Sequence, residues 1–148
     1  MIFKRRQPRI KRLLIVEDEA LVAFDNEYFL KAAGYEILAT VDNAEAAIAA
    51  LSGVTDLVVL DVNISGEGDG IDVAKAAREK NIPVIFVTGA CPNHARAYAM
   101  GCLAKPYNDR DLVASIKALD KVIAGEKVGN IPGGLTLFGE ADEAAAAK

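Results

Sequence analysis

The chain has 148 residues, of which 52% are hydrophobic and 26% are charged. This length suits one domain with a packed core, and the composition excludes a disordered chain. No apolar run approaches the ~18 residues of a membrane span, and no apolar signal-peptide core follows the basic start. We therefore expect a cytoplasmic protein without a membrane partner.

Positive charge is concentrated at the N-terminus. The first 12 residues hold six Lys and Arg residues and no acid, although the whole chain has a formal net charge of −4. Such a cluster can contact nucleic acid or an acidic partner, but it is more often a solvated arm. We interpret residues 1–9 as a solvated basic arm, and nucleic acid is not an expected partner.

Hydrophobic periodicity alternates between two kinds of segment. Short, mainly apolar segments predict strands at residues 13–16, 36–40, 57–60, 84–88 and 102–104. Helical patterns predict helices at residues 20–33, 43–51, 71–80, 93–100 and 109–124. Asp42 and Glu45 have the spacing of a capping box, and Asn108 is the expected N-cap of the last helix.

The first predicted helix carries Leu21, Phe24 and Tyr28 on one stripe, which we expect to face the core. Five alternations of strand and helix predict an α/β fold over residues 10–125, with a parallel sheet covered on both faces. Residues 126–148 contain Gly and Pro breaks and an alanine-rich end, so we expect a flexible tail.

Ligands of an open α/β sheet bind beyond the carboxyl ends of its strands. Polar residues follow four of the predicted strands at that end: Glu17-Asp18-Glu19, Asp61, Thr88 and Lys105. Parallel pairing gathers these strand ends at one edge, so carboxylates, a hydroxyl and an ammonium group are expected to meet there.

This set of groups suits phosphoryl chemistry. Clustered carboxylates repel one another unless a hard cation neutralises them, and oxygen ligands favour Mg²⁺. A carboxylate beside Mg²⁺ can act as a nucleophile towards phosphorus. The Lys105 ammonium and the Thr88 hydroxyl can each stabilise one phosphoryl oxygen.

A calcium loop is the competing interpretation of residues 60–72. Oxygen-bearing side chains there approach EF-hand spacing, at Asp61, Asn63, Ser65, Glu67, Asp69 and Asp72. However, position 8 of that loop is Gly68, position 12 is Asp72 in place of the usual Glu, and the preceding segment is β-rich. We therefore reject the calcium loop and interpret GEGDG as a link into the third helix.

Four motifs carry a family resemblance: LLIVEDEA, LVVLDV, VIFVTG and LAKP. In this order and spacing they resemble the receiver domain of bacterial two-component response regulators, over roughly residues 10–124. The resemblance implies a flavodoxin-like (βα)5 fold with strand order 2-1-3-4-5, as in CheY. It also implies a protein that is not an enzyme, apart from Mg²⁺-assisted self-phosphorylation and self-dephosphorylation.

By the same resemblance, Asp61 is the phosphoacceptor and Mg²⁺ is the cofactor. Asp18 and Asp61 would bind the metal directly, Asn63 through its backbone carbonyl, and Glu17 through water.

The remaining roles also follow the family motifs. Thr88 would be the switch hydroxyl and Lys105 the phosphate-contacting lysine. Gly89 would leave room for the phosphoryl group, and the Lys105–Pro106 peptide bond is expected to be cis.

The chain departs from the family pattern at its two cysteines. Most receivers have Tyr or Phe three residues before the lysine, where this chain has Cys102. With this missing aromatic residue and the FVTG sequence, the chain resembles a subgroup of single-domain receivers named for the FATGUY motif. Cys91 departs from that motif, because it stands in place of an aromatic residue. The cysteines have no metal-ligand spacing, so we expect reduced thiols. Without the aromatic residue, we expect phosphorylation to order mainly residues 89–100.

Two other functions are weighed against the regulator. A dinucleotide-binding enzyme needs a Gly-rich first turn, whereas this chain has VEDEA there. A Mg²⁺-dependent phosphatase of the haloacid-dehalogenase type shares the Asp nucleophile, but it places that residue after the first strand. This second function is the alternative to the regulator.

The resemblance also implies partners. These are a sensor histidine kinase or a histidine phosphotransfer protein, and a downstream protein target. The 24 residues after Ala124 are too few for an output domain. We therefore expect the chain to signal by conformational change, or by relaying or sinking phosphate.

Overall fold

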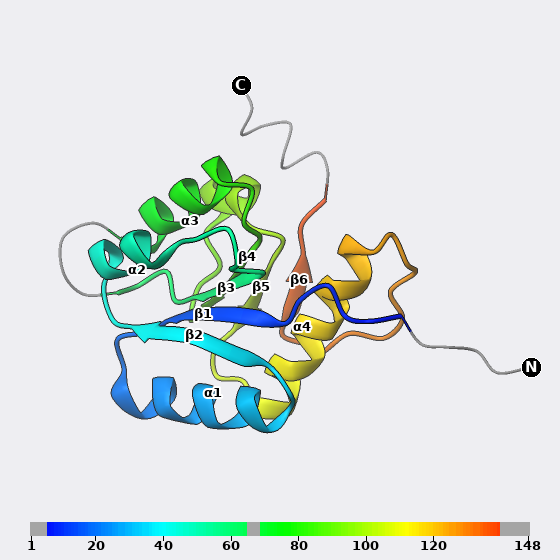
Figure 1. The fold of residues 1–148 in the computed structure, drawn as a ribbon. Coiled ribbons are helices and arrows are strands. Elements are labelled where there is room, and N and C mark those ends of the chain that lie inside the picture. The colour runs from blue at the N-terminus through cyan, green and yellow to red at the C-terminus, as the bar shows by residue number, and fades with distance from the viewer. Residues whose placement is uncertain (1–5, 65–68, 140–148) are drawn as a thin grey trace, which may run out of the picture.

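The computed structural model describes residues 6–64 and 69–139. Within these residues one sheet has the strand order β2-β1-β3-β4-β5-β6, and helices cover both of its faces (Figure 1). The strands are β1 (Arg12–Val16), β2 (Glu36–Val41), β3 (Leu57–Leu60), β4 (Val84–Thr88), β5 (Gly101–Ala104) and β6 (Leu135–Leu137). The helices are α1 (Ala20–Ala32), α2 (Ala44–Ala50), α3 (Gly70–Glu79), the 3₁₀ helix η1 (Asn93–Tyr98) and α4 (Asp109–Ile123).

The predicted flavodoxin-like α/β fold and its strand order 2-1-3-4-5 are confirmed. Strands β1 to β5 pair in parallel, and β6 pairs antiparallel to β5. Two details differ from the prediction. Asn43, not Asp42, caps α2 with its side chain, and residues 93–98 form a 3₁₀ helix. Asn108 caps α4 as predicted. Among the described helices, none is long and apolar enough to cross a membrane.

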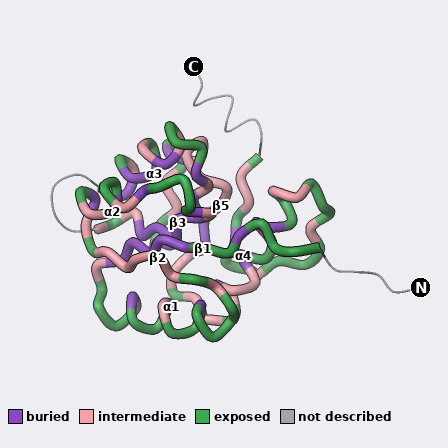
Figure 2. The backbone as a smooth tube through the Cα atoms, in the orientation of Figure 1, coloured by how far each residue is buried: buried purple, intermediate pink, exposed green. Residues whose placement is uncertain are grey.

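Each face of the sheet has its own core. One core packs strand residues such as Val16 and Phe86 against α2, α3 and η1. The other packs residues such as Ile15 and Val59 against α1 and α4. Successive strand residues point to opposite faces, so burial on both faces explains the continuous apolar runs of β1, β3 and β4. Figure 2 shows β1 and β3 as buried segments between the helical layers.

The predicted core face of α1 is wrong. Leu21, Phe24 and Tyr28 are 83%, 68% and 64% exposed. The buried residues of α1 are Ala23, Asn26 and Leu30. The Asn26 side chain is satisfied there, because its Nδ2 donates to the Tyr107 hydroxyl at 3.0 Å. A polar residue therefore faces the core, while an apolar stripe faces outward.

The C-terminal segment also differs from the prediction of a flexible tail. Its described part, residues 126–139, includes β6, which covers the edge of β5. The Phe138 N–H donates to the Met100 carbonyl at 2.9 Å, and Leu135 is buried. A Cβ added to Gly101 would lie 2.7 Å from the Thr136 carbonyl oxygen, so this close pairing requires glycine. The folded domain therefore extends past residue 125, because β5 would otherwise leave its edge unpaired.

The basic arm is docked where it is described. Asp120 Oδ1 accepts the backbone N–H groups of Arg9 and Ile10, at 2.7 and 2.9 Å. The Arg6 guanidinium forms ion pairs with Asp120 Oδ2 at 2.6 Å and with Glu126 Oε1 at 2.8 Å. Residues 6–9 are thus held on α4, in contrast to the predicted solvated arm, and residues 1–5 lie outside the described range.

This docking predicts a specific pH dependence. Burial raises the pKa of Asp120, but the hydrogen bonds from Ile10, Arg6 and Arg9 lower it more, so its pKa lies below the usual value. A lowered folded-state pKa adds stability above the unfolded-state pKa, about 3.9, which is lost as the pH falls through the folded-state value. Asp120→Asn keeps an acceptor oxygen but has no charge to lose.

We therefore expect Asp120→Asn to be less stable than the wild type at pH 7, with the difference shrinking towards pH 3. Urea unfolding of both proteins at the two pH values measures it. A difference that stays constant with pH would show that Asp120 is not the titrating group.

The prediction of reduced thiols is wrong as well. Cys91 and Cys102 form a disulfide, with their Cα atoms 6.1 Å apart. Cys102 pairs with Phe86 of β4 and points into the core beneath η1. The chain turns back over that face after Thr88, which brings Cys91 above Cys102. No sequence spacing signals this contact, because the sheet register creates it.

Candidate functional site

The ends of four strands meet at one edge of the sheet. Val16 of β1 pairs with Leu60 of β3, so the residues that follow them, Glu17 and Asp61, are neighbours. Thr88 of β4 pairs with Ala104 of β5, which places Lys105 at the same edge. The structure therefore brings together the residues predicted from the strand ends.

Three carboxylates form the centre of this site. One oxygen from each of Glu17, Asp18 and Asp61 lies within 4.8 Å of the other two. Glu17 and Asp61 are buried, and Asp18 is more exposed. Burial raises the pKa of Glu17 above its usual value, although hydrogen bonds from Lys105 and the Glu19 N–H oppose the shift. Clustered oxygen donors with this charge fit a hard cation such as Mg²⁺.

Lys105 neutralises part of that charge. Its Nζ lies 2.8 Å from Glu17 Oε1 and 3.1 Å from Asp61 Oδ2. Burial lowers the pKa of Lys105, but its hydrogen bonds to Glu17 and Asp61 raise the pKa more, so the ammonium stays charged. The Lys105–Pro106 peptide bond is cis, as the resemblance implies. Lys105 is thus fixed beside the carboxylates, where its ammonium can also form an ion pair with a bound anion.

Asn63 connects Asp61 to Thr88. The Asn63 backbone N–H donates to Asp61 Oδ1 at 2.9 Å, and its Nδ2 lies 3.3 Å from Thr88 Oγ1. Thr88 is fully buried, whereas Gly89 is exposed and has open space where a Cβ would lie. Asn63 therefore links the two groups, through its backbone N–H to the Asp61 carboxylate and through its side chain to the Thr88 hydroxyl.

Gly70 is a site residue that the sequence analysis missed. A Cβ at Gly70 would lie 2.5 Å from Val62 Cα and 2.8 Å from the Asp61 carbonyl oxygen. The first turn of α3 therefore packs directly against the backbone that carries Asp61. The sequence signal is the last glycine of GEGDG, a motif that on sequence grounds indicates only a link into α3.

The residues that suggested a calcium loop have another function. Asp69 is the N-cap of α3, and its side chain accepts the N–H groups of Ile71 and Asp72. The Asp72 side chain accepts the Asp69 N–H in return, which completes a capping box. This explains the acid at position 12 of the apparent loop, while Ser65 and Glu67 lie outside the described residues.

Two clefts flank α1 beside the acidic cluster. One, of about 490 Å³, is lined by residues of α1 and by Glu19, Lys105 and Tyr107. The other, of about 520 Å³, is lined by Glu17, Asp18 and Phe24, among others. The exposed stripe of α1 therefore lies between two hollows, one of which reaches Glu17 and Asp18 while the other reaches Lys105.

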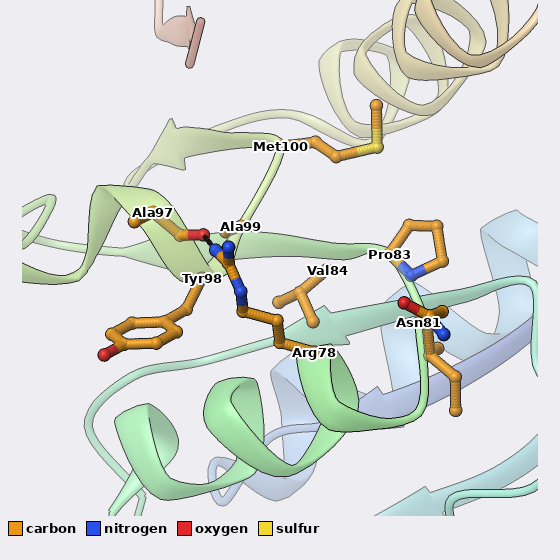
Figure 3. Close-up of a pocket in the computed structure, with 9 residues that line it drawn as sticks. Arg78, Asn81, Pro83, Val84, Ala97, Tyr98, Ala99 and Met100 are labelled. Atoms are coloured by element: carbon orange, nitrogen blue, oxygen red, sulfur yellow. Dashed lines mark hydrogen bonds between the residues drawn. The ribbon is translucent and has the colours of Figure 1, made fainter. Parts of the chain in front are cut away.

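A third cleft, of about 370 Å³, lies at the opposite edge of the sheet. Figure 3 shows Pro83 and Val84 at the amino end of β4, with the Arg78 guanidinium donating to the Ala97 carbonyl. Its lining includes no carboxylate, thiol or histidine. This cleft therefore lacks the groups needed for phosphoryl chemistry and is separate from the Asp61 site.

Comparison with known proteins identifies the family. A model of the response regulator receiver domain matches residues 13–117. The chain belongs to this family. The transcriptional regulatory protein PdtaR of Mycobacterium tuberculosis is 38% identical over 114 residues, which cover 72% of this chain and 55% of that protein. The alkaline phosphatase synthesis regulator PhoP of Bacillus subtilis is 28% identical and covers 74% of this chain and 48% of its own length.

Solved receiver structures agree with this assignment. The response regulator TrrA of Thermotoga maritima, in complex with Mg(2+)-BeF, has a TM-score of 0.66 and 30% identity, covering 74% of this chain and 98% of its own. A CheY-like receiver protein of Methanospirillum hungatei has a TM-score of 0.66 and 25% identity, covering 80% of this chain and 99% of its own. The receiver domain described here spans about half the length of the curated relatives it matches.

The family match confirms the predicted class, a receiver domain related to response regulators of two-component systems. It favours that class over the alternative phosphatase of the haloacid-dehalogenase type. Membership of the FATGUY subgroup stays a prediction.

Proposed function

We propose that this receiver domain accepts a phosphoryl group on Asp61 from the phosphohistidine of a kinase or phosphotransfer protein, in the cytoplasm. The observation that carries the proposal is the convergence of Glu17, Asp18 and Asp61 with the Lys105 ammonium. In the transfer, a bond forms between an Asp61 oxygen and phosphorus. The bond from phosphorus to the donor nitrogen breaks, and the imidazole keeps that electron pair.

The side chains around Asp61 have complementary roles in this proposal. Asp18, Asp61 and the Asn63 backbone carbonyl would hold Mg²⁺, with Glu17 binding through water. Bound Mg²⁺ supplies charge neutralisation between the carboxylates and the incoming phosphoryl oxygens. The Asn63 N–H fixes one Asp61 oxygen, which leaves Oδ2, beside Lys105, turned towards the ammonium.

Lys105 and Thr88 would respond to the new charge. The Lys105 ammonium can exchange one of its carboxylate contacts for a phosphoryl oxygen. The Thr88 hydroxyl, which accepts a hydrogen bond from Asn63, has its own proton free to donate to another phosphoryl oxygen. Movement of Thr88 would draw Gly89 and the segment after it towards Asp61, which gives the receiver its signal.

Phosphorylation by a small donor tests the proposal. Acetyl phosphate with Mg²⁺ is expected to add one phosphate to the wild-type chain, seen by intact mass and lost in alkaline hydroxylamine. The same reaction in EDTA is the control and should leave the mass unchanged. Equal labelling with and without Mg²⁺ would contradict the proposed chemistry.

Asp18→Ala addresses the metal. Loss of one of three carboxylates is expected to weaken Mg²⁺ binding at least about tenfold, since even outer-sphere changes commonly cost that much. It also relieves repulsion with buried Glu17, so the metal-free fold should lose no stability. Calorimetric titration with Mg²⁺ measures the affinity, and an unchanged value would place the metal elsewhere.

The exposed stripe of α1 is the surface on which we expect the histidine-bearing partner to dock. Leu21 and Phe24 lie in the first turns of α1, between a cleft that reaches Glu17 and Asp18 and a cleft that reaches Lys105. An apolar stripe of this size on a helix suits packing against another helix. A donor histidine must approach Asp61 from outside the sheet edge, and a partner seated on this stripe would be adjacent to it.

The double variant Leu21→Asp with Phe24→Asp separates docking from chemistry. A panel of autophosphorylated histidine kinases is first screened for phosphoryl transfer to the wild type. The rate of transfer from the active kinases is expected to fall about tenfold or more in the double variant. Labelling by acetyl phosphate should not change. Val54→Asp is the matched control, because Val54 is 54% exposed but precedes β3 at the other edge of the sheet. Equal losses in both variants would argue against a docking role for α1.

A further inference from the structure

The disulfide joins two parts of the chain that flank the phosphorylation site. Cys91 lies three residues after Thr88, and Cys102 lies in the middle of β5. Between them are η1 and the return to the sheet at Gly101. The chain contains two cysteines in all, so this pair is its only possible internal disulfide.

The bond fixes the segment that we expect to move. Gly89 and Ala90 are exposed and connect Thr88 to Cys91. Cys102 is buried and held by its pairing with Phe86, so it is a fixed anchor. While the disulfide is intact, Cys91 cannot leave the surface of β5, and the loop between Thr88 and Cys91 has little freedom to follow Thr88.

We propose that Cys91–Cys102 is a reversible thiol–disulfide modification site that controls how far residues 89–100 respond to phosphorylation. This inference rests on the proposed function of Asp61. In the dithiol form the segment is free to follow Thr88, and in the disulfide form its response is confined to the residues next to Thr88. The chemical partner is a dithiol reductant, with a disulfide such as oxidised glutathione acting in the opposite direction.

Reduction of the disulfide proceeds by thiol–disulfide exchange in two steps. A thiolate of the reductant attacks the sulfur of Cys91, which is half-buried, while Cys102 is fully buried. As the S–S bond breaks, the Cys102 sulfur leaves as a thiolate, which then takes up a proton. The second thiol of the reductant then attacks the mixed disulfide and releases the Cys91 thiol. Two electrons and two protons pass to the protein, and the reductant becomes a disulfide.

We expect the fold to survive reduction of the bond. Cys102 is one member of a core that also includes Phe86, Val84 and Ala95, and a reduced cysteine is a small apolar side chain in the same space. Ala95 holds η1 on that core independently of Cys91. Reduction should therefore loosen the segment without unfolding the domain.

Linkage supplies a reciprocal expectation. If the reduced form binds the phosphoryl mimic more tightly because its segment is free to follow Thr88, the mimic must favour the reduced form by the same factor. With beryllofluoride and Mg²⁺ as the phosphoryl mimic, the ratio of dithiol to disulfide at a fixed glutathione poise is expected to rise about fivefold or more.

The experiment uses the full chain in both redox states, verified by counting alkylated thiols. NMR shifts of residues 89–100 are recorded with and without beryllofluoride, and the glutathione equilibrium is measured in parallel. The reduced protein should show larger shifts in this segment, together with the altered ratio. Cys91→Ala with Cys102→Ala is the control and should behave like the reduced protein in both buffers.

The outcomes are distinguishable. Equal segment shifts in both states with an unchanged glutathione ratio would show that the disulfide is only structural, and would overturn this inference alone. Collapse of amide dispersion on reduction would also overturn it. Absence of any mimic-induced shift in either state would overturn the proposed function, and this inference with it.

Discussion

Asp61→Asn is expected to abolish phosphorylation by acetyl phosphate, because a carboxamide is not a nucleophile towards phosphorus. The substitution is nearly isosteric, and its oxygen can still accept the Asn63 N–H that now bonds Asp61 Oδ1. It also removes a negative charge beside Glu17, whose raised pKa is due first to burial and also to Asp61. The metal-free variant should therefore be at least as stable as the wild type.

Intact mass after acetyl phosphate treatment and thermal unfolding together test this expectation. Asp25→Asn is the matched control, since Asp25 is an exposed acid on α1. The control should gain one phosphate like the wild type. Full labelling of Asp61→Asn would contradict the assignment, whereas a folded variant without label supports it.

Gly70→Ala is expected to impair both the fold and the site. The added methyl group would meet Val62 Cα at 2.5 Å, the Val62 carbonyl oxygen at 2.7 Å and the Asp61 carbonyl oxygen at 2.8 Å. All three are backbone atoms and cannot rotate away. Overpacking of this kind costs roughly 1–3 kcal/mol, and here relief requires movement of the segment that carries Asp61.

We therefore expect a lower free energy of unfolding in urea and slower labelling by acetyl phosphate for Gly70→Ala. Gly53→Ala is the control, because open space surrounds the position of its Cβ. Stability of Gly70→Ala within about 0.5 kcal/mol of the wild type would mean that α3 yields without strain.

The sheet and the set of clustered residues could be predicted from the sequence because both follow from strand order. Buried parallel strands read as apolar runs, and parallel pairing forces their carboxyl ends to one edge. Glu17, Asp61, Thr88 and Lys105 each lie at a strand end, so their proximity required no knowledge of side-chain packing.

The orientation of α1 could not be predicted in the same way. The spacing of Leu21, Phe24 and Tyr28 is repeated by Ala23, Asn26 and Leu30, and hydropathy favours the first set. The second set is buried because Tyr107, far along the chain, satisfies Asn26. The exposed stripe of α1, which we propose as a docking surface, therefore appeared in the sequence as a core face.

Long-range pairing explains the other errors. The Cys91–Cys102 bond and the antiparallel strand β6 both depend on the register of β5, which no local pattern encodes. The docking of the N-terminal residues likewise depends on Asp120, more than a hundred residues away. In each case the sequence gives no sign of order in the segment, because a residue or strand far along the chain holds it in place.

Mapping the phosphate on the wild-type chain tests the central claim most directly. After acetyl phosphate and Mg²⁺, borohydride reduces an aspartyl phosphate to homoserine, and peptide mass spectrometry locates the change. We expect homoserine at position 61 in the Mg²⁺ sample and unmodified aspartate there in the EDTA control. Homoserine at another acidic position, or phosphate retained on His94 with Asp61 unchanged, would contradict the account.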